Sequence, residues 1–208
     1  MVETDIIQKE KAKNIVVLAS GNGSNFQAII DAVDRDEINA VISALISNNP
    51  DAYALKRASL HGIRTVLIKP ADYETRDDYN NTLLKVLIEI DPHLIILAGY
   101  MLMLGKQIVH RFNGRIINIH PALLPSFKGA HGIKDAYEYG VKVTGVTVHY
   151  VDEEMDTGKI IAQEAVRIFN EDTLETLEER IHKVEHRLYP ETIAELLNNK
   201  LRKKDRGI

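Results

Sequence analysis

Short runs of apolar residues alternate with amphipathic segments along the first 119 residues of the chain. Each run is rich in Val, Ile or Leu and has the length of one buried strand; the runs occupy residues 14–19, 40–47, 65–68, 94–99 and 115–119. Between them, apolar side chains recur at helical spacing in segments 26–33, 51–61 and 72–90. Because parallel strands need crossover connections, this alternation predicts a mostly parallel sheet with helices on both faces.

The rest of the chain has a different pattern. Residues 144–151 and 159–166 resemble two strands, and the acidic loop 152–158 between them is short enough to predict an antiparallel hairpin. Segment 172–197 carries Leu and Ile along one helical face and should pack on the sheet, with Pro190 kinking or interrupting it. The expected fold class is therefore α/β: a Rossmann-like, mostly parallel sheet with helices on both faces and an antiparallel C-terminal hairpin.

Length and composition favour one domain. The chain has 208 residues, 45% hydrophobic and 27% charged, which is enough to bury one large core. We expect a single domain at 14–197, a flexible polar arm at 1–13 and a solvated basic tail at 198–208.

Composition also argues against several classes of function. The chain has no cysteine, which removes disulfides, thiolate chemistry, zinc fingers and iron–sulfur clusters and fits a reducing compartment. A net charge of -4 gives no general attraction for nucleic acid. The longest apolar run, 94–104, is too short for a membrane span, and the charged N-terminus does not resemble a secretory signal. We expect a cytoplasmic protein that binds neither nucleic acid nor membrane.

A glycine-rich turn, Ser20–Asn25, joins the first strand to the first helix. Ser24 or Asn25 can cap that helix. Free backbone N–H groups and the positive end of the helix dipole would then meet at Gly23, Ser24 and Asn25, which favours an anion. Only two glycines of a dinucleotide fingerprint are present, so a single phosphate fits better than a dinucleotide. A tight turn without a ligand is the alternative.

Asn118 and His120 are polar residues at the end of an apolar strand. Because they are two positions apart, their side chains project from the same side of the sheet. Pro121 and Pro125 end the strand and constrain the loop that follows. An imidazole in this position can transfer protons. A structural histidine that only hydrogen-bonds a loop carbonyl is the alternative.

Three features follow the carboxyl ends of predicted strands: the turn at Gly23–Asn25, the apolar loop Met101–Leu104, and the Asn118 and His120 pair. Ligands of open α/β sheets bind outside these ends, so the three features should meet at one edge. The apolar loop could line a pocket for a flat organic ligand or could pack into the core. A carboxylate of loop 152–158 could lie against His120 and raise its pKa, or the loop could be a solvated turn.

His182, Glu185 and His186 match the H-x-x-E-H spacing of one class of zinc protease. No third ligand is evident downstream, and Arg187 would add positive charge beside the metal. We expect no metal. A solvated helix face, or one or two residues that reach a substrate, fits this segment better.

The segments Ser20–Asn25, Asn118–Pro125 and Asp156–Gly158 in combination resemble the folate-dependent formyltransferase family, over about residues 14–197. The Asn-x-His-Pro motif, the Leu-Leu-Pro loop and the later Asp-x-Gly are specific to folate-formyl enzymes, and Gly-Asn-Gly-Ser-Asn resembles the branch in purine biosynthesis. The resemblance implies an enzyme that transfers the formyl group of 10-formyltetrahydrofolate to the amino group of 5′-phosphoribosylglycinamide. It implies small-molecule substrates, no metal, and a monomer or homodimer.

The resemblance also implies roles for individual residues. The catalytic residues would be Asn118, His120 and Asp156. Phosphoribosylglycinamide would contact Gly23, Ser24, Asn25, His182, Lys183, Val184 and Glu185. The folate would contact Arg76, Met101, Leu102, Met103, Leu104, Asn118, Asp152, Glu153, Glu154, Met155 and Asp156. Many relatives have Arg at the position of Leu102, which leaves one polar contact on the folate side open.

In the implied mechanism, the glycinamide amine attacks the formyl carbon and negative charge develops on oxygen. Asn118 and protonated His120 stabilise this charge, and Asp156 keeps the imidazole oriented and charged. His120 donates or shuttles the proton that the folate nitrogen needs to leave, and the attacking amine loses one proton in return. Methionyl-tRNA formyltransferase and formyltetrahydrofolate hydrolase share this formyl-folate chemistry, but their chains are longer and carry an additional domain. A non-catalytic phosphate-binding module is the alternative of another class, and it leaves the three catalytic candidates unexplained.

Overall fold

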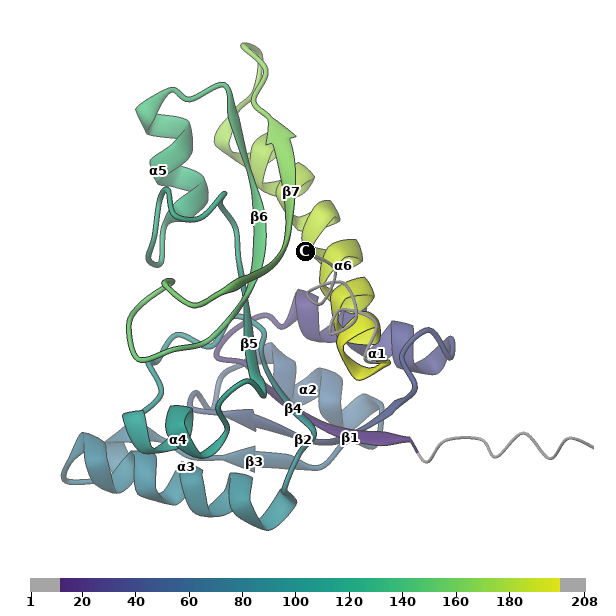
Figure 1. Cartoon of the computed structure of the whole chain (residues 1–208), viewed down its shortest axis with the longest axis vertical. Helices are drawn as coiled ribbons and strands as arrows, with labels where there is room; N and C mark the ends of the chain where they lie inside the picture. The colour runs from purple at the N-terminus through teal and green to yellow at the C-terminus, as the bar shows by residue number, and fades with distance from the viewer. Residues whose placement is uncertain (1–11, 199–208) are drawn as a thin grey trace, which may run out of the picture.

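The structure is a computed structural model that describes residues 12–198 (Figure 1). The predicted arm, 1–13, lies outside the described residues except for its last two positions, and Lys13 is already the first residue of strand β1 (Lys13–Leu18). The predicted tail, 198–208, lies outside them except for Asn198, which caps the last helix.

One seven-stranded sheet forms the centre of the structure, with the strand order β3-β2-β1-β4-β5-β6-β7. The remaining strands are β2 (Ala40–Ser47), β3 (Thr65–Leu67), β4 (Leu94–Leu97), β5 (Ile116–His120), β6 (Val143–Tyr150) and β7 (Ile160–Arg167). Strands β1 to β5 pair in parallel, whereas β5–β6 and β6–β7 pair antiparallel. The predicted parallel sheet with an antiparallel hairpin at its end is confirmed.

Helices cover both faces of this sheet. They are α1 (Ser24–Asp34), α2 (Tyr53–Leu60), α3 (Arg76–Ile90), α4 (Lys106–Arg111), α5 (Gly132–Tyr139) and α6 (Leu174–Leu197), with one short 3-10 helix, η1 (Pro70–Asp72). The single helix predicted at 72–90 is two elements, because the Thr75 side chain accepts a hydrogen bond from the Asp78 backbone and caps α3. Helix α4 was not predicted, since six residues are too few for a clear period.

Helix α6 runs through Pro190 without interruption, so of the two predicted effects of this proline, a kink or an interruption, the interruption is wrong. Proline removes one backbone hydrogen bond and crowds the preceding turn. Here Tyr189 and Ile193, on either side of Pro190, are fully buried against the sheet. Their burial holds both halves of the helix on the same surface and outweighs the lost bond.

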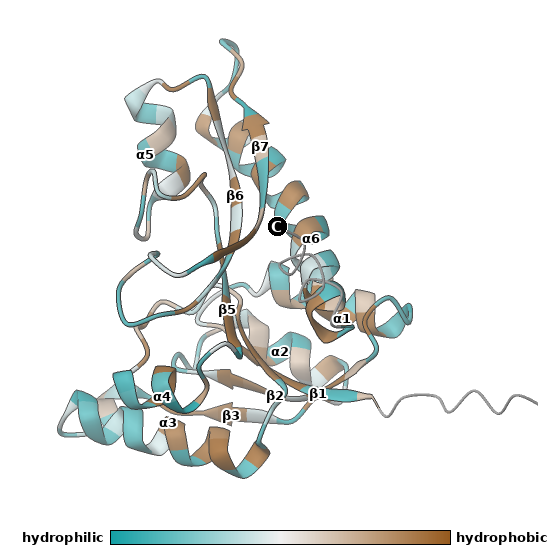
Figure 2. Cartoon of the chain, in the orientation of Figure 1, coloured by the Kyte–Doolittle hydropathy of each residue, from teal (hydrophilic) through white to brown (hydrophobic). Residues whose placement is uncertain are grey.

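Alternate residues of the central strand β1 point into two separate cores. Ile15 and Val17 face the core under α1, α2 and α6. Val16 and Leu18 face the core under α3 and α4. In Figure 2 the strands β2 and β5 are mostly brown, whereas β6, β7 and the helices mix brown with teal. A strand buried on both faces reads as a continuous apolar run, which is why the sequence pattern located it.

The strand order reverses between β1 and β4, and this reversal opens a crevice at their carboxyl ends. The register across the crevice is continuous: Leu18 pairs with Leu97, Leu97 with Asn118, and Asn118 with His149. The loops that follow β1, β4 and β5 therefore leave the sheet at the same level. This arrangement brings together segments that are about a hundred residues apart in the sequence.

Candidate active site

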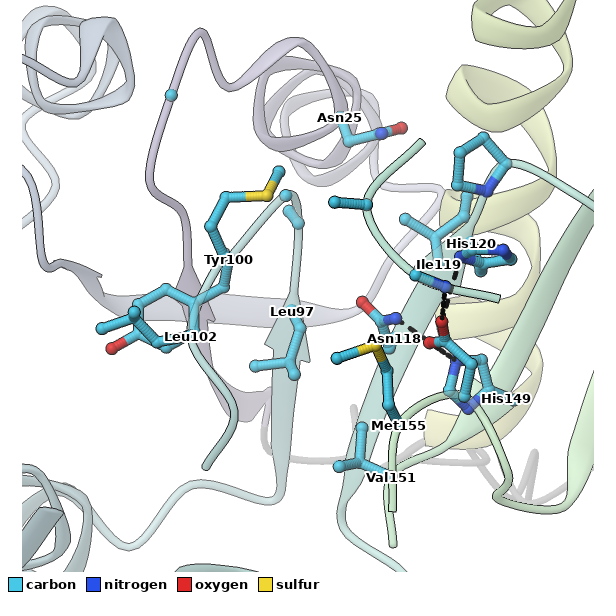
Figure 3. A pocket seen from close by; sticks show the side chains of 18 of the residues that line it. Asn25, Leu97, Tyr100, Leu102, Asn118, Ile119, His120, His149, Val151 and Met155 are labelled. Carbon is cyan, nitrogen blue, oxygen red and sulfur yellow. Dashed lines mark hydrogen bonds and ion pairs between the residues drawn. The ribbon is translucent and has the colours of Figure 1, made fainter. Parts of the chain in front are cut away.

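A cavity of about 610 Å³ lies at this edge of the sheet (Figure 3). A volume of this size accommodates a small organic ligand. Its walls are formed by the turn 21–25, residues 97–104, residues 118–121, part of the 151–156 segment, and two residues of α6. The predicted meeting of the three features at one edge is confirmed.

The glycine turn forms one end of the cavity. Gly23 caps α1 in a left-handed conformation, with φ at 73°, so the prediction that Ser24 or Asn25 caps the helix is wrong. Only glycine fits here, because a Cβ on Gly23 would lie 2.7 Å from the Cβ of Ala54. Ser24 and Asn25 instead form the first turn of α1. Their backbone N–H groups lack intrahelical partners and make a site for an anion.

Glu185 on α6 closes the wall beside this turn. Its Oε2 accepts hydrogen bonds from Asn25 Nδ2 at 3.2 Å and from His182 Nδ1 at 2.8 Å, and the residue is only 4% exposed. The hydrogen bond to Glu185 raises the pKa of His182. Burial lowers the pKa of His186, whose ring stacks on that of His182. His182 is therefore the member of the pair that carries charge at the higher pH.

The segment after β4 forms the opposite wall. Its position is fixed at two points: the Met101 backbone N–H donates to Ser20 Oγ at 2.9 Å, and the buried Tyr100 hydroxyl is hydrogen-bonded to that of Tyr79. Met101 and Met103 are 69% and 48% exposed, whereas Leu102 and Leu104 are partly buried against the core under α3 and α4; all four residues line the cavity. Thioether side chains adapt to flat apolar ligands.

His120 lies at the end of β5 with only 3% of its surface exposed. Its Nε2 is 2.8 Å from the Phe127 carbonyl, which can only accept, so this nitrogen carries a hydrogen. Its Nδ1 is 3.5 Å from Asp156 Oδ2. The imidazole therefore hydrogen-bonds a loop carbonyl, as in the structural interpretation, and it also lies against a carboxylate of the loop 152–158, the contact that the sequence offered as a possibility.

Asp156 faces two histidines and one backbone amide. Its Oδ2 accepts from the Gly129 N–H at 2.8 Å, and its Oδ1 is 3.6 Å from His149 Nε2. Burial acts to raise the pKa of Asp156, but the neighbouring His149, the Gly129 amide and His120 together lower it. Asp156 is thus an anion at neutral pH and sits where it can stabilise an imidazolium.

His149 is a cavity residue that the sequence interpretation did not include. It is 2% exposed, and its Nε2 lies 3.2 Å from Asn118 Nδ2. Its Nδ1 donates to the Tyr150 carbonyl at 2.8 Å, so Nε2 of the neutral ring accepts from Asn118, whereas Nε2–H of the charged ring faces the Asp156 carboxylate. The alternation of strand 144–151 puts His149 on the same face as Thr147, opposite Val146 and Val148, and the structure buries both faces of this strand, so the pattern alone did not single out His149.

Four predicted contact residues do not line the cavity: Arg76, Glu153, Lys183 and Val184. Arg76 donates to the Met103 carbonyl at 2.7 Å and so supports the loop from outside. Glu153 points to α4, while Lys183 is exposed and Val184 packs against the core. The other predicted contacts all line the cavity.

Within residues 12–198, no group of three or more His, Asp or Glu side chains is arranged to hold a metal ion. The H-x-x-E-H segment instead forms the hydrogen bond between His182 and Glu185. In the same part of the chain, no helix has the length and apolar character needed to cross a membrane.

This fold and this site define a class of one-carbon transferase: the chain belongs to the formyl transferase family, whose model matches residues 13–193. It is 45% identical over 185 residues to phosphoribosylglycinamide formyltransferase of Bacillus subtilis, covering 89% of this chain and 95% of the relative. It is 42% identical over 201 residues to trifunctional purine biosynthetic protein adenosine-3 of Drosophila melanogaster, covering 95% of this chain and 15% of that protein.

The fold is also similar to that of solved structures. Glycinamide ribonucleotide transformylase 1 from Symbiobacterium toebii superposes with a TM-score of 0.90 at 38% identity, covering 96% of this chain and 94% of that one. The resemblance to formyltransferases that the motifs indicated is confirmed, and so is the predicted fold class.

Proposed function

We propose that this protein transfers the formyl group of 10-formyltetrahydrofolate to the amino group of 5′-phosphoribosylglycinamide. The observation that carries the proposal is the position of Asn118, His120 and Asp156 in one cavity with an anion-binding turn at its other end. The names of the relatives at 45% and 42% identity support this acceptor. The match over 13–193 also supports a single domain at 14–197.

The turn at Gly23–Asn25 would hold the substrate phosphate through backbone N–H groups and the α1 dipole. Glu185 and His182 lie beside it and would contact the ribose side of the same molecule. The glycinamide amine would then extend along the cavity toward His120. A charged phosphate fixed at one end limits the orientations available to the amine at the other.

The folate would lie between the loop 101–104 and the loop 152–156. Met101, Met103 and Met155 give this region exposed thioether surface on both sides. Leu102 also lines it, so the folate would be held here mainly by apolar contact. The co-substrate supplies the formyl carbon, and the protein has to position it and handle charge and protons.

Asn118 and His120 would stabilise the oxyanion that forms when the amine attacks the formyl carbon. Asn118 Nδ2 has two hydrogens: one donates to His149, and the other can donate to the developing oxyanion. His120 Nε2–H has to exchange the Phe127 carbonyl for a substrate atom before it can donate a proton. Asp156 would hold the imidazole in its charged form during that step.

An assay with 10-formyltetrahydrofolate and three acceptors tests the proposal. With phosphoribosylglycinamide as the acceptor, the assay should show turnover, measured as the release of tetrahydrofolate. With water or methionyl-tRNA as the acceptor, it should show none. Turnover with either of the latter, and none with the ribonucleotide, would overturn the proposal. We further propose a cytoplasmic location and a monomeric or homodimeric state. Light scattering of the purified chain measures the oligomeric state.

A further inference from the structure

The back of the glycine turn is held by helix α2, and one arginine makes most of the contacts. Arg57 Nε donates to the Asn22 backbone carbonyl at 2.9 Å, and its Nη2 donates to Asn22 Oδ1 at 3.0 Å. Its Nη1 donates to Gln27 Oε1 at 3.1 Å. Three nitrogens of one guanidinium thus bind both the turn and the first part of α1.

We propose that Arg57 is a positioning residue that holds the phosphate-binding turn in its binding conformation, and this proposal rests on the proposed function. Asn22 lies between Gly21 and Gly23, where the backbone has the least intrinsic preference. Gln27 lies one helical turn into α1, and its N–H donates to the Gly23 carbonyl at 2.9 Å. Bridging the two sets the angle at which the N–H groups of the turn meet a phosphate.

Two other contacts show that this support is part of α2 as a whole. The Ala54 N–H donates to the Gly21 carbonyl at 3.2 Å, and Ala54 is the residue that excludes any side chain at Gly23. The Arg57 guanidinium also lies 4.9 Å from the centre of the Tyr53 ring, which limits its freedom to rotate. Because it does not line the cavity, Arg57 acts on the substrate through the turn.

A planar guanidinium is needed for this role, because a lysine has a single nitrogen and cannot reach three acceptors at fixed angles. The chain offers a matched control in Lys56, the preceding residue on the same helix. Lys56 carries the same charge and lies over the same Tyr53 ring, at 5.5 Å, but it is exposed and has no hydrogen bond to Asn22 or Gln27.

The test is calorimetric titration of R57Q, R57K and K56Q with glycinamide ribonucleotide, with its dephosphorylated nucleoside and with inorganic phosphate. R57Q and R57K should both weaken ribonucleotide and phosphate binding, roughly tenfold to a hundredfold, and leave the nucleoside unchanged. K56Q should behave like the wild type. Full affinity in R57K would show that only the charge matters, and an equal loss for nucleoside and nucleotide would show a general structural role. Either result overturns the proposal.

Failure of the proposed function would look different. If the wild type binds these ligands but transfers no formyl group, the enzyme assignment fails. The comparison of R57Q with K56Q still measures how Arg57 affects ligand affinity at the turn. If the ribonucleotide does not bind at all, inorganic phosphate gives the same comparison without reference to the acceptor. Equal phosphate affinity in R57Q and K56Q would then reject the role of Arg57.

Discussion

Asn118 and His149 are register partners on the antiparallel strands β5 and β6, and their side chains meet at 3.2 Å. The Tyr150 carbonyl takes the Nδ1 hydrogen of His149, so Nε2 of the neutral ring presents a lone pair to the Asn118 amide. This contact determines which end of the amide faces the histidine. Figure 3 shows this contact; the second N–H of Asn118 Nδ2 is then available for the oxyanion of the proposed mechanism.

Replacement of His149 should therefore lower kcat while the Michaelis constants change little. In H149F the Asn118 amide loses its acceptor and its orientation, and kcat should fall on the order of tenfold to a hundredfold. H149Q keeps an acceptor and should retain more activity than H149F. Steady-state kinetics with both substrates checks this, and equal kcat values for the wild type and H149F would show that His149 does not orient Asn118.

Asp156 should stabilise the folded protein in a defined range of pH. Its pKa is lowered, because the contacts with His149, the Gly129 amide and His120 outweigh the effect of burial. A carboxyl with a lowered pKa stabilises the fold above its unfolded value of about 3.9, and that contribution is lost as the pH falls through the lowered value. Urea unfolding should show D156N less stable than the wild type at neutral pH, with the difference shrinking in acid.

The exposed Glu154 on the same loop provides the control for this measurement. E154Q should follow the wild-type dependence of unfolding free energy on pH. A constant difference between D156N and the wild type from neutral pH to about pH 3 would mean that ionisation of Asp156 does not stabilise the fold.

His182 should make binding of the phosphate substrate depend on pH. The hydrogen bond to Glu185 raises the pKa of His182, so its charge is complete below the ordinary histidine value and is lost as the pH rises through the raised value. A cation beside the anion-binding turn attracts the phosphate. The Michaelis constant for the ribonucleotide should rise over that range in the wild type and should be flat in H182Q. The exposed His110 serves as control, and H110Q should keep the wild-type dependence of this Michaelis constant on pH. If the Michaelis constant is independent of pH in H110Q as well, the effect does not arise from His182.

Glu153 should hold the loop 152–158 against α4. Its carboxylate pairs with Lys106 Nζ at 2.8 Å and with His110 Nε2 at 2.5 Å. All three groups are exposed, so the effect should be small and screened by salt. E153Q should raise the Michaelis constant for the folate at low salt and leave that for the ribonucleotide unchanged. E138Q breaks an exposed pair elsewhere, with Lys134, and should change neither constant; equal behaviour of the two variants would contradict the anchoring role.

The central strands could be predicted from the sequence because a strand that is buried on both faces consists of a continuous apolar run. The runs at 94–99 and 115–119 then located Asn118, at the end of the second run, and Met101 and His120, just after the two runs, at the carboxyl edge. From spacing alone, the carboxylate partner of His120 could be assigned only to the loop 152–158; the family resemblance named Asp156, and the structure has its Oδ2 3.5 Å from His120 Nδ1.

The residues that were missed depend on contacts between distant segments. His149 meets Asn118 through the register of β5 with β6, and the register of two strands that are not joined by a short turn is not encoded locally. Arg57 contacts Asn22 from the next helix, 35 positions along the chain, so no motif includes both. Helix α4, which carries the partners of Glu153, was too short to give a periodic signal.

Single-turnover kinetics of H120A with both substrates saturating tests the central claim most directly. The proton donor is absent from this variant, so the rate of formyl transfer should fall on the order of a hundredfold to ten-thousandfold. Dissociation constants for ribonucleotide and folate, and the far-ultraviolet circular dichroism, should remain those of the wild type. A transfer rate in H120A equal to that of the wild type would contradict a catalytic role for His120 and, with it, the proposed mechanism.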